Sequence, residues 1–466
     1  GRIFGGKHEM AARYPTSRGG VTAAASEPRG GLLKILGVGF GVAVSVGAAI
    51  GAGILRAPAT IAGEVPYGAA ILGLWILGGL QAMLSANIYA ELSAAVPKSG
   101  GQNVLAQRIY GDLGRLVVGW AEWITCVAAV AATSVSFADF MPLIVPAAAA
   151  HKGAVAAGLQ IAIYATNLLG LREGRAIQAV TSAVKAGMLL LFAIAAFLIS
   201  TGSRHALPPV SAATAVIWTW GGFILAYKLV AAAYSGWITP IIFAGENVSP
   251  GRSIPRALFL GIGLTAVLYI AANAGLLFAL GTGGIRASPL PFTSVISGIG
   301  GAVPAVLFAI TAAIAVASCS NANAMSSSRV LYALAEDGIL PRSLRTVNAG
   351  GSPTLAFLMS GVVSLLLAAT GRFALVFGLV ATLNIANAVL IELGFFILRR
   401  REPELARPYR ALGYPWLPAL ALAIDASILC FIASADHEGI LVAIGLTLLC
   451  IPFAIAGRAR RIAANH

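Results

Sequence analysis

Long apolar stretches recur along almost the whole chain, and they constrain its fold more than any other feature. Each is about 17 to 30 residues long, the length that an α-helix needs to cross roughly 30 Å of hydrocarbon. Hydrophobic residues make up 58% of the chain and charged residues only 10%, so a soluble fold would lack polar surface. The pattern predicts an all-α polytopic membrane protein with twelve transmembrane helices, over residues 35–62, 67–96, 116–140, 153–169, 176–199, 215–243, 257–280, 303–332, 353–370, 373–398, 416–432 and 439–456.

The net charge of +14 could indicate a nucleic-acid-binding protein, so the positions of the basic residues decide its meaning. If the N-terminus is cytoplasmic, the basic residues of the tails and loops lie mostly on the inner side. The outer loops hold only Lys152, Arg204, Arg286 and Arg372. This asymmetry is the positive-inside pattern. It predicts a multi-pass protein of the cell (inner or plasma) membrane with both termini cytoplasmic, and no nucleic acid as partner.

The two ends of the chain are expected to be cytoplasmic tails. Residues 1–31 are rich in Gly, Ala and Arg and contain no long apolar run, which predicts a disordered tail without a cleavable signal. Met10 is an alternative start of the chain. Residues 458–466 form the second predicted tail.

Two spans carry clusters of helix-breaking residues. The first contains Gly51 and Gly53 in the run GAAIGAGIL, and the sixth contains Gly236 and Pro240 in the run AAAYSGWITP. Two broken helices five spans apart are typical of transporters built from inverted five-helix repeats. The alternative is that the glycines only let helices pack closely. The predicted units are a first repeat at 32–200, a second repeat at 215–399 and two further spans within 411–457.

If these spans unwind, they expose backbone groups of opposite polarity at mid-membrane. The amides of residues 52–54 would be free donors at a positive helix end, which suits a carboxylate. The carbonyls of residues 231–233 would end the first half of the sixth span, which suits an ammonium group. Together they predict a site for a zwitterion, formed by Ile50, Gly51, Ala52, Gly53, Ile54, Ala231, Ala232, Ala233, Tyr234, Ser235 and Gly236.

Few ionisable residues lie within the spans, where each is costly by at least about 2.5 kcal/mol at the helix centre. Lys185 lies about 13 Å into the fifth span at 1.5 Å per residue. We expect it to carry a coupling proton or to occupy a cation site permanently. The alternative is a lysine paired with carbonyls for packing alone. The role of Lys228 stays ambiguous, and Glu91 and Glu122 stay open between gating and packing.

Several residue patterns that would indicate chemistry are missing from the sequence. All five histidines lie in tails or loops, which argues against a membrane-embedded metalloenzyme or a histidine-dependent hydrolase. The cysteines show no paired spacing, so neither a disulfide framework nor a zinc site is predicted. No Walker lysine pattern occurs, so ATP is not expected as the direct energy source. We therefore expect no catalytic residue, no metal and no cofactor. We expect transport to be secondary.

Five segments occur in a fixed order across both halves of the chain. They are IGAGI in the first span, YAELSAAVPKSGGQ at the end of the second, AYSGWITPIIFAGENVSPGRSIPRAL through the sixth, SSSRVLYALAEDGILP after the eighth and RPYRALGYPWLP before the eleventh. This ordered set resembles the amino acid, polyamine and organocation (APC) superfamily, and within it the L-type amino acid transporter branch. Each segment alone is a weak motif, whereas the set at matching spacings is specific.

The resemblance implies the leucine-transporter fold, with spans one to five and six to ten as inverted repeats and two peripheral spans. It also implies that the substrate lies between spans one and six. The glycine run at residues 51–54 would then hold the carboxylate, and residues 231–233 the amino group. Lys185, within AVTSAVKAGMLLL, matches a span-five lysine that takes the place of a sodium ion in sodium-independent relatives.

The chain departs from the family pattern at two positions. The family usually carries an aromatic lid two residues before the tyrosine of the sixth span, where this chain has Ala232, so the source of a lid stays open. Ala52 stands where many relatives have serine, which removes a hydroxyl but leaves the backbone donors. Small residues at both breaks favour a larger neutral amino acid as cargo.

We therefore expect a sodium-independent transporter of neutral amino acids that works by proton coupling or by amino acid exchange with alternating access. The lipid bilayer is its surrounding, and no accessory subunit is expected. An amine or polyamine permease of the same fold is the alternative, and it would need an acidic pocket residue such as Glu122. A membrane sensor or scaffold has no need of two broken helices, and a membrane enzyme would need clustered polar catalytic groups.

Overall fold

The structure is a computed structural model that describes residues 37–98, 100–168, 174–202, 219–244, 247–336, 338–348, 352–453 and 455. These residues form helices and their connections, with no strand among them apart from an isolated bridge between Val347 and Pro353. The predicted tails at 1–31 and 458–466 lie outside the described residues.

Each of the first six predicted spans corresponds to one or more helices. The first consists of α1 (Val38–Ala49) and α2 (Ala52–Glu64), followed by α3 (Gly68–Ala95), α4 (Gln102–Ile144), α5 (Lys152–Leu168) and α6 (Gly174–Gly202). The sixth consists of α7 (Trp220–Tyr234), the 3₁₀ turn η2 (Ser235–Ile238) and α8 (Thr239–Ile242).

The remaining predicted spans are single helices. They are α9 (Pro250–Ala287), α11 (Ala302–Glu336), α12 (Thr354–Ala369), α13 (Phe373–Arg401), α14 (Trp416–Ala435) and α15 (His437–Leu448). Three short helices lie in connections: η1 (Pro146–His151), α10 (Pro291–Gly300) and η4 (Arg342–Arg345).

Nine helices of the described chain are long and apolar enough to cross a membrane, with each broken span counted once. The all-α, polytopic membrane class is thereby confirmed. The other three predicted spans are the shorter helices α5, α12 and α15. The total of twelve spans stays a prediction.

The long helices are apolar on every side, as membrane helices must be. In α3, Trp75 is fully buried, whereas Leu77 and Leu80 are about half exposed. Because these exposed residues are as apolar as the buried ones, water is not a suitable surrounding for them, and lipid is.

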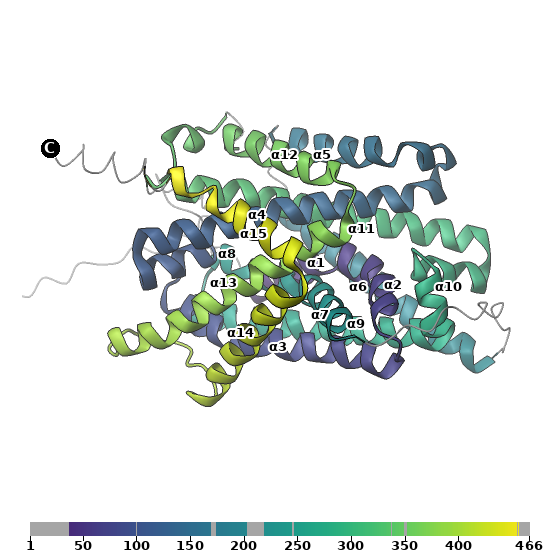
Figure 1. The fold of residues 1–466 in the computed structure, drawn as a ribbon, viewed down its shortest axis with the longest axis horizontal. Helices are drawn as coiled ribbons and strands as arrows, with labels where there is room; N and C mark the ends of the chain where they lie inside the picture. The colour runs from purple at the N-terminus through teal and green to yellow at the C-terminus, as the bar shows by residue number, and fades with distance from the viewer. Residues whose placement is uncertain are drawn as a thin grey trace, which may run out of the picture. The chain divides into compact units, whose positions relative to one another are not determined.

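Helices that are five spans apart pack against each other. The contacts join α2 with α7, α3 with α9, α4 with α11 and α5 with α12. Figure 1 shows α5 beside α12, above the long pair α4 and α11. The same arrangement brings the break between α1 and α2 against α7 and η2, so two distant glycine-rich segments meet in the core.

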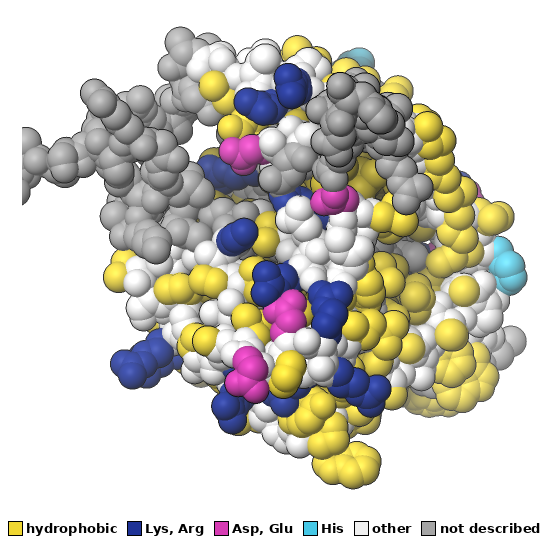
Figure 2. Space-filling view, turned by 90° about the vertical axis from the view of Figure 1, so that its left-hand side faces the viewer, with side chains coloured by type: hydrophobic (Ala, Val, Ile, Leu, Met, Phe, Trp, Pro, Cys, Tyr) yellow, Lys and Arg dark blue, Asp and Glu magenta, His cyan; other side chains and the backbone are white. Residues whose placement is uncertain are grey.

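Ion pairs join residues that the sequence places on the same side of the membrane. On the predicted outer side, Arg56 and Lys152 contact Asp139 at 2.8 and 2.9 Å. On the predicted inner side, the pair of Arg108 and Glu402 (2.6 Å) links the start of α4 with the end of α13. Figure 2 shows the molecule from the predicted inner side, where Lys and Arg side chains gather beside fewer carboxylates.

Candidate functional site

The first span is interrupted at two residues. Ile50 and Gly51 are non-helical, with φ and ψ of −74° and 99° and of −158° and −141°. The Ile50 amide still donates to the Val46 carbonyl, and the Leu55 amide donates to the Gly51 carbonyl. The amides of residues 52–54 form the first turn of α2, where no carbonyl of that helix can accept from them. They are the donors that the sequence predicts.

Side chains from three other helices cap the carbonyls that end α1. The Lys185 Nζ on α6 donates to the Gly47 carbonyl at 2.8 Å. The Cys319 Sγ on α11 contacts the Ala48 carbonyl at 3.2 Å, and the Tyr269 hydroxyl on α9 donates to the Ala49 carbonyl at 2.7 Å. Lys185 is buried, so its charge stands at the negative pole of a half-helix.

The sixth span is interrupted differently, because its own side chains cap it. The amide and hydroxyl of Ser235 both donate to the Ala232 carbonyl, the hydroxyl at 2.8 Å. The Thr239 hydroxyl donates to the Gly236 carbonyl at 2.8 Å. The Ala233 carbonyl accepts from the Tyr269 hydroxyl at 3.1 Å. The Ala232 and Gly236 carbonyls thus each accept two hydrogen bonds, whereas the Ala233 carbonyl keeps a second lone pair for a ligand.

The two breaks touch, and glycine makes the contact sterically feasible. A Cβ on Gly53 would lie 2.7 Å from the Cα of Ala233, and a Cβ on Gly236 would lie 2.2 Å from the amide nitrogen of Ala49. Neither position has room for a larger residue. The Tyr269 hydroxyl contacts both breaks, since the carbonyls of Ala49 and Ala233 both lie within hydrogen-bonding distance.

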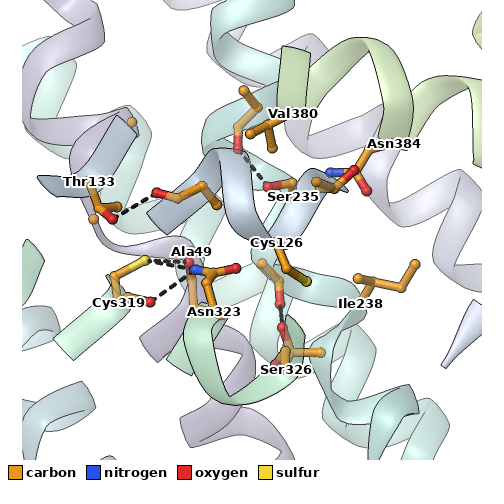
Figure 3. A pocket seen from close by; sticks show the side chains of 18 of the residues that line it. Ala49, Cys126, Thr133, Ser235, Ile238, Cys319, Asn323, Ser326, Val380 and Asn384 are labelled. Atoms are coloured by element: carbon orange, nitrogen blue, oxygen red, sulfur yellow. Dashed lines mark hydrogen bonds between the residues drawn. The ribbon is translucent and has the colours of Figure 1, made fainter. Parts of the chain in front are cut away.

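A cavity of about 60 Å³ lies at this contact (Figure 3). Most of the residues predicted for the site line it, namely Gly51, Ala52, Gly53, Ala232, Ala233, Ser235 and Gly236.

Four predicted residues lie elsewhere. Ile50 and Ile54 are fully buried in the apolar core. Ala231 lines a second, adjoining cavity. Tyr234 packs on Trp75 and donates its hydroxyl to the Trp75 carbonyl at 2.9 Å. Their contribution is therefore to hold the break rather than to face the cavity.

Helices α4, α11 and α13 add polar groups to the cavity wall, of which only Glu122 was considered from the sequence. In α11, Cys319, Asn323 and Ser326 are four and then three positions apart and therefore share one face. Figure 3 shows Cys319 and Asn323 close to Ala49, and Ser235 close to Asn384. Polar residues at helical spacing inside an apolar span were the signal for this face. The polar side chains that these helices place on the cavity wall are Gln102, Glu122, Thr125, Cys126, Thr133, Cys319, Asn323, Ser326 and Asn384.

Glu122 places a carboxyl group on the cavity wall. It is almost fully buried and accepts from the Gln102 amide at 3.4 Å and from the Asn103 side chain at 3.3 Å. It takes part in no ion pair within the described part of the chain. The cavity thus contains one acidic group besides the backbone of the breaks.

An aromatic residue reaches the cavity from α13 although Ala232 provides none. Phe377 lines the cavity and stacks on Phe373, with ring centroids 5.2 Å apart. The Arg56 guanidinium lies 4.2 Å above the Phe373 ring and also contacts Asp139. This column connects the cavity with the charged residues at the predicted outer side.

The other two charged residues considered from the sequence lie away from the cavity. Lys228 is buried and pairs with Asp436, which precedes α15. Burial opposes ionisation of Asp436, but hydrogen bonds from Lys228 and from the Gly439 amide hold its pKa below the ordinary value. Glu91 accepts from Arg399 at 2.9 Å and contacts Arg407 at 3.0 Å.

Comparison of the sequence with known proteins identifies the family of the chain. The family model for amino acid permeases matches residues 41–455, which include both breaks and every helix around the cavity. The chain belongs to the amino acid permease family. The permease is therefore a member of the APC superfamily, as the sequence motifs indicated.

Three relatives cover most of the permease. It is 25% identical over 402 residues to the serine/threonine exchanger SteT of Bacillus subtilis, a match that covers 84% of the permease and 90% of SteT. It is 25% identical over 399 residues to the branched-chain amino acid permease BcaP of the same organism, covering 81% and 84%. It is 27% identical over 456 residues to the mouse large neutral amino acids transporter small subunit 2, covering 95% and 84%. These relatives are transporters, which confirms that the permease is not an enzyme.

Proposed function

We propose that this permease is a secondary active transporter that moves neutral amino acids across the cytoplasmic membrane without sodium, by proton coupling or by amino acid exchange. One observation carries the proposal. The free first-turn amides of α2 and the carbonyls that end α7 meet at a single cavity. An amino acid needs donors for its carboxylate and acceptors for its ammonium group, and the two breaks provide one of each.

The lining around the breaks supports a neutral side chain. The cavity wall next to the backbone groups consists of small uncharged residues such as Ala129, Ala232 and Ala233. Phe377 adds an aromatic surface that an apolar side chain can contact. The relatives are named for serine and threonine, for branched-chain amino acids and for large neutral amino acids, which are all neutral cargoes.

The contact of Lys185 with the first break supports sodium independence. Its ammonium group donates to the Gly47 carbonyl, so a positive charge already stands where a coupling cation would stabilise the end of α1. A lysine can also release its proton when its surroundings change, which a metal ion cannot do. We therefore assign Lys185 as the cation-site residue and as one candidate for proton coupling.

The packing of helices five spans apart supports an inverted 5+5 repeat. Residues 32–200 and 215–399 would form the repeats, with 411–457 as two peripheral spans and both termini cytoplasmic. A site at the interface of two repeats can open to either side when one repeat rocks against the other. No accessory subunit is part of this proposal.

An amine or polyamine permease of the same fold is the alternative, and Glu122 favours it. A cargo without a carboxylate would use the Glu122 carboxylate as its counter-charge and would not need the α2 amides. The two functions therefore assign different groups to the same cavity.

Uptake into proteoliposomes tests the proposal. A panel of radiolabelled amino acids and polyamines is offered with and without internal amino acid, sodium and a pH gradient. The proposal predicts counterflow of at least one neutral amino acid, unchanged when sodium is replaced by choline. Uptake of polyamines alone would favour the alternative, and sodium-dependent uptake would contradict the role given to Lys185.

A further inference from the structure

Two acidic side chains, Glu392 on α13 and Asp425 on α14, lie together inside the membrane-spanning part of the fold. Both are fully buried. Their carboxyl groups lie near enough to share a hydrogen bond. Two ionised carboxylates cannot form such a bond, since each is only an acceptor. A hydrogen bond between the two groups would therefore need a proton on one of them.

The hydrogen bonds around this pair lack one donor. Asp425 accepts from the Gln81 side-chain amide at 2.7 Å and from the Ser85 hydroxyl at 3.2 Å. Within the described residues, neither carboxyl oxygen of Glu392 accepts a hydrogen bond. One proton between the two side chains would supply the missing donor. It would also remove one of two adjacent negative charges from a medium in which charge is costly.

The cations on neighbouring helices have other partners. Lys228 on α7 pairs with Asp436, and Arg399 on α13 pairs with Glu91 on α3. The remaining charged or titratable groups on the packed helices are Arg108, Tyr110, Asp112, Arg115, Glu122, Cys126 and Asp139 on α4, Tyr89 on α3, Tyr227 and Tyr234 on α7, Arg400 and Arg401 on α13, Cys430 on α14, and His437 and Glu438 on α15, the last with its partner Arg372. Helix α12 and the turn η2 contain no ionisable residue. No cation of the described chain is paired with Glu392 or Asp425.

A second cavity connects the pair with the central site. It has a volume of about 40 Å³, and its walls include Gln81 and Ser85, the two donors to Asp425. Three residues line both cavities, namely Ser235, Ile238 and Asn384. Water in the second cavity would therefore contact Gln81 and Ser85, the donors to Asp425, on one side and the break of the sixth span on the other.

A chain of hydrogen bonds continues from the second cavity to Glu122. Tyr89 lines this cavity and donates its hydroxyl to the Gln102 side-chain oxygen at 3.0 Å. The backbone amide of Gln102 donates to the Glu122 carboxylate at 3.4 Å. Polar groups thus extend from the acidic pair to the cavity that holds the proposed amino acid site.

We propose that Glu392 and Asp425 form a proton-binding site that holds one shared proton and exchanges it with water of the second cavity during transport. Binding forms one O–H bond on a carboxylate and changes the charge of the pair from −2 to −1; release reverses both. The site rests on the burial of both side chains, on the packing of α13 against α14, on the unpartnered oxygens of Glu392 and on the two donors to Asp425. Its use in coupling rests on the proposed function and makes the pair a second proton site besides Lys185.

Infrared difference spectroscopy tests the site without any cargo. The purified permease is titrated with acid and base while the carbonyl stretch of protonated carboxylic acids is recorded. The wild type is expected to lose such a band as the pH rises, and Glu392→Gln is expected to lack it. Glu438→Gln, a matched change at an exposed acid, should keep it. A titrating band of equal size in Glu392→Gln would overturn the proposal, as would a wild-type band that shifts with sodium but not with pH.

Proteoliposomes test the coupling. With a pH gradient and no internal amino acid, Glu392→Gln and Asp425→Asn are expected to lose proton-driven accumulation, while counterflow of the same amino acid persists and shows that the variants fold. Accumulation at the wild-type level in both variants would overturn the coupling role. If the wild type moved no amino acid at all, the proposed function would fail, whereas the spectroscopic result would still decide the proton site.

Discussion

The two broken spans of this permease are held open in different ways. The carbonyls that end α1 depend on Lys185, Tyr269 and Cys319, which come from three other helices. The carbonyls at the second break are capped mainly by Ser235 and Thr239, which belong to the same span. The first break is thus a product of tertiary packing, and the second is largely local. A conformational change that moves α6 or α11 must alter the first break, whereas the second can keep its form.

Substitutions at the contact between the two breaks are expected to have the largest effect on transport. Gly53→Ala and Gly236→Ala would each push a methyl group into the backbone of the other break. Overpacking of about 1–3 kcal/mol, relieved by separating the breaks, would lower transport by roughly 5- to 150-fold. Initial rates of counterflow in proteoliposomes measure the effect.

Two matched glycines serve as controls for this prediction. Gly63 on α2 and Gly221 on α7 have open space around a Cβ, so their alanine variants should transport within about twofold of the wild type, a surface-type effect. Equal losses of transport in all four variants would show that alanine disturbs these helices in general. The contact between the two breaks would then not explain the loss.

Removal of the Lys185 ammonium group tests the external capping of the first break. Lys185→Met keeps the length of the side chain and leaves the Gly47 carbonyl without its charged donor. An unsatisfied buried group costs about 1–3 kcal/mol, so counterflow should fall by roughly 5- to 150-fold. Lys152→Met, at an exposed ion pair, should have little effect. Wild-type counterflow by Lys185→Met would show that the first break does not need this cap.

An aromatic side chain contacts the first break, since the Phe377 ring lies against Gly53. Phe377→Ala would remove apolar contact worth about 1.5 kcal/mol, so the KM for a large neutral amino acid should rise about tenfold. The KM for a small amino acid should change less, and kcat should stay similar. An equal rise in KM for both cargoes would place Phe377 outside contact with the side chain of the cargo.

The Tyr269 hydroxyl contacts both breaks. Tyr269→Phe removes it and should lower counterflow about fivefold, which corresponds to one hydrogen bond of about 1 kcal/mol. Tyr110→Phe is the matched control, because it removes a hydroxyl that donates to the Leu390 carbonyl at 2.7 Å away from the breaks. Both variants should lose similar thermal stability. A loss of transport in both would mean that stability alone explains the effect.

The local caps of the second break should matter least. In Ser235→Ala and Thr239→Ala, the backbone amide of the substituted residue still donates to the same carbonyl, and the change should stay within about twofold for each variant. Counterflow rates measure it under the same conditions. A loss as large as that of Lys185→Met would show that the two breaks do not differ in the way described.

The sequence predicted the spans and the breaks because both depend on local composition. Apolar length indicates a membrane helix without knowledge of its neighbours, and glycine with proline indicates where such a helix unwinds. Most of the residues named for the site, from Gly51 to Gly236, line the central cavity for this reason. The shorter helices α5, α12 and α15 show where length alone is a weak criterion.

The sequence did not predict the groups that meet only through packing. Tyr269, Cys319 and Phe377 reach the breaks from helices that are distant in the chain. Glu392 and Asp425 each stand alone in an apolar span, and only the packing of α13 on α14 makes them a pair. Such contacts require the arrangement of the helices, which apolar periodicity does not determine.

The most direct test of an amino acid site between the two breaks is a structure of the permease bound to the neutral amino acid that shows the strongest counterflow. We expect the carboxylate to contact the amides of residues 52–54 and the ammonium group to lie at the carbonyls that end α7. We also expect the cargo side chain to lie beside Phe377. An amino group bound to the Glu122 carboxylate, with no ligand atom at the α2 amides, would contradict the account and favour an amine permease.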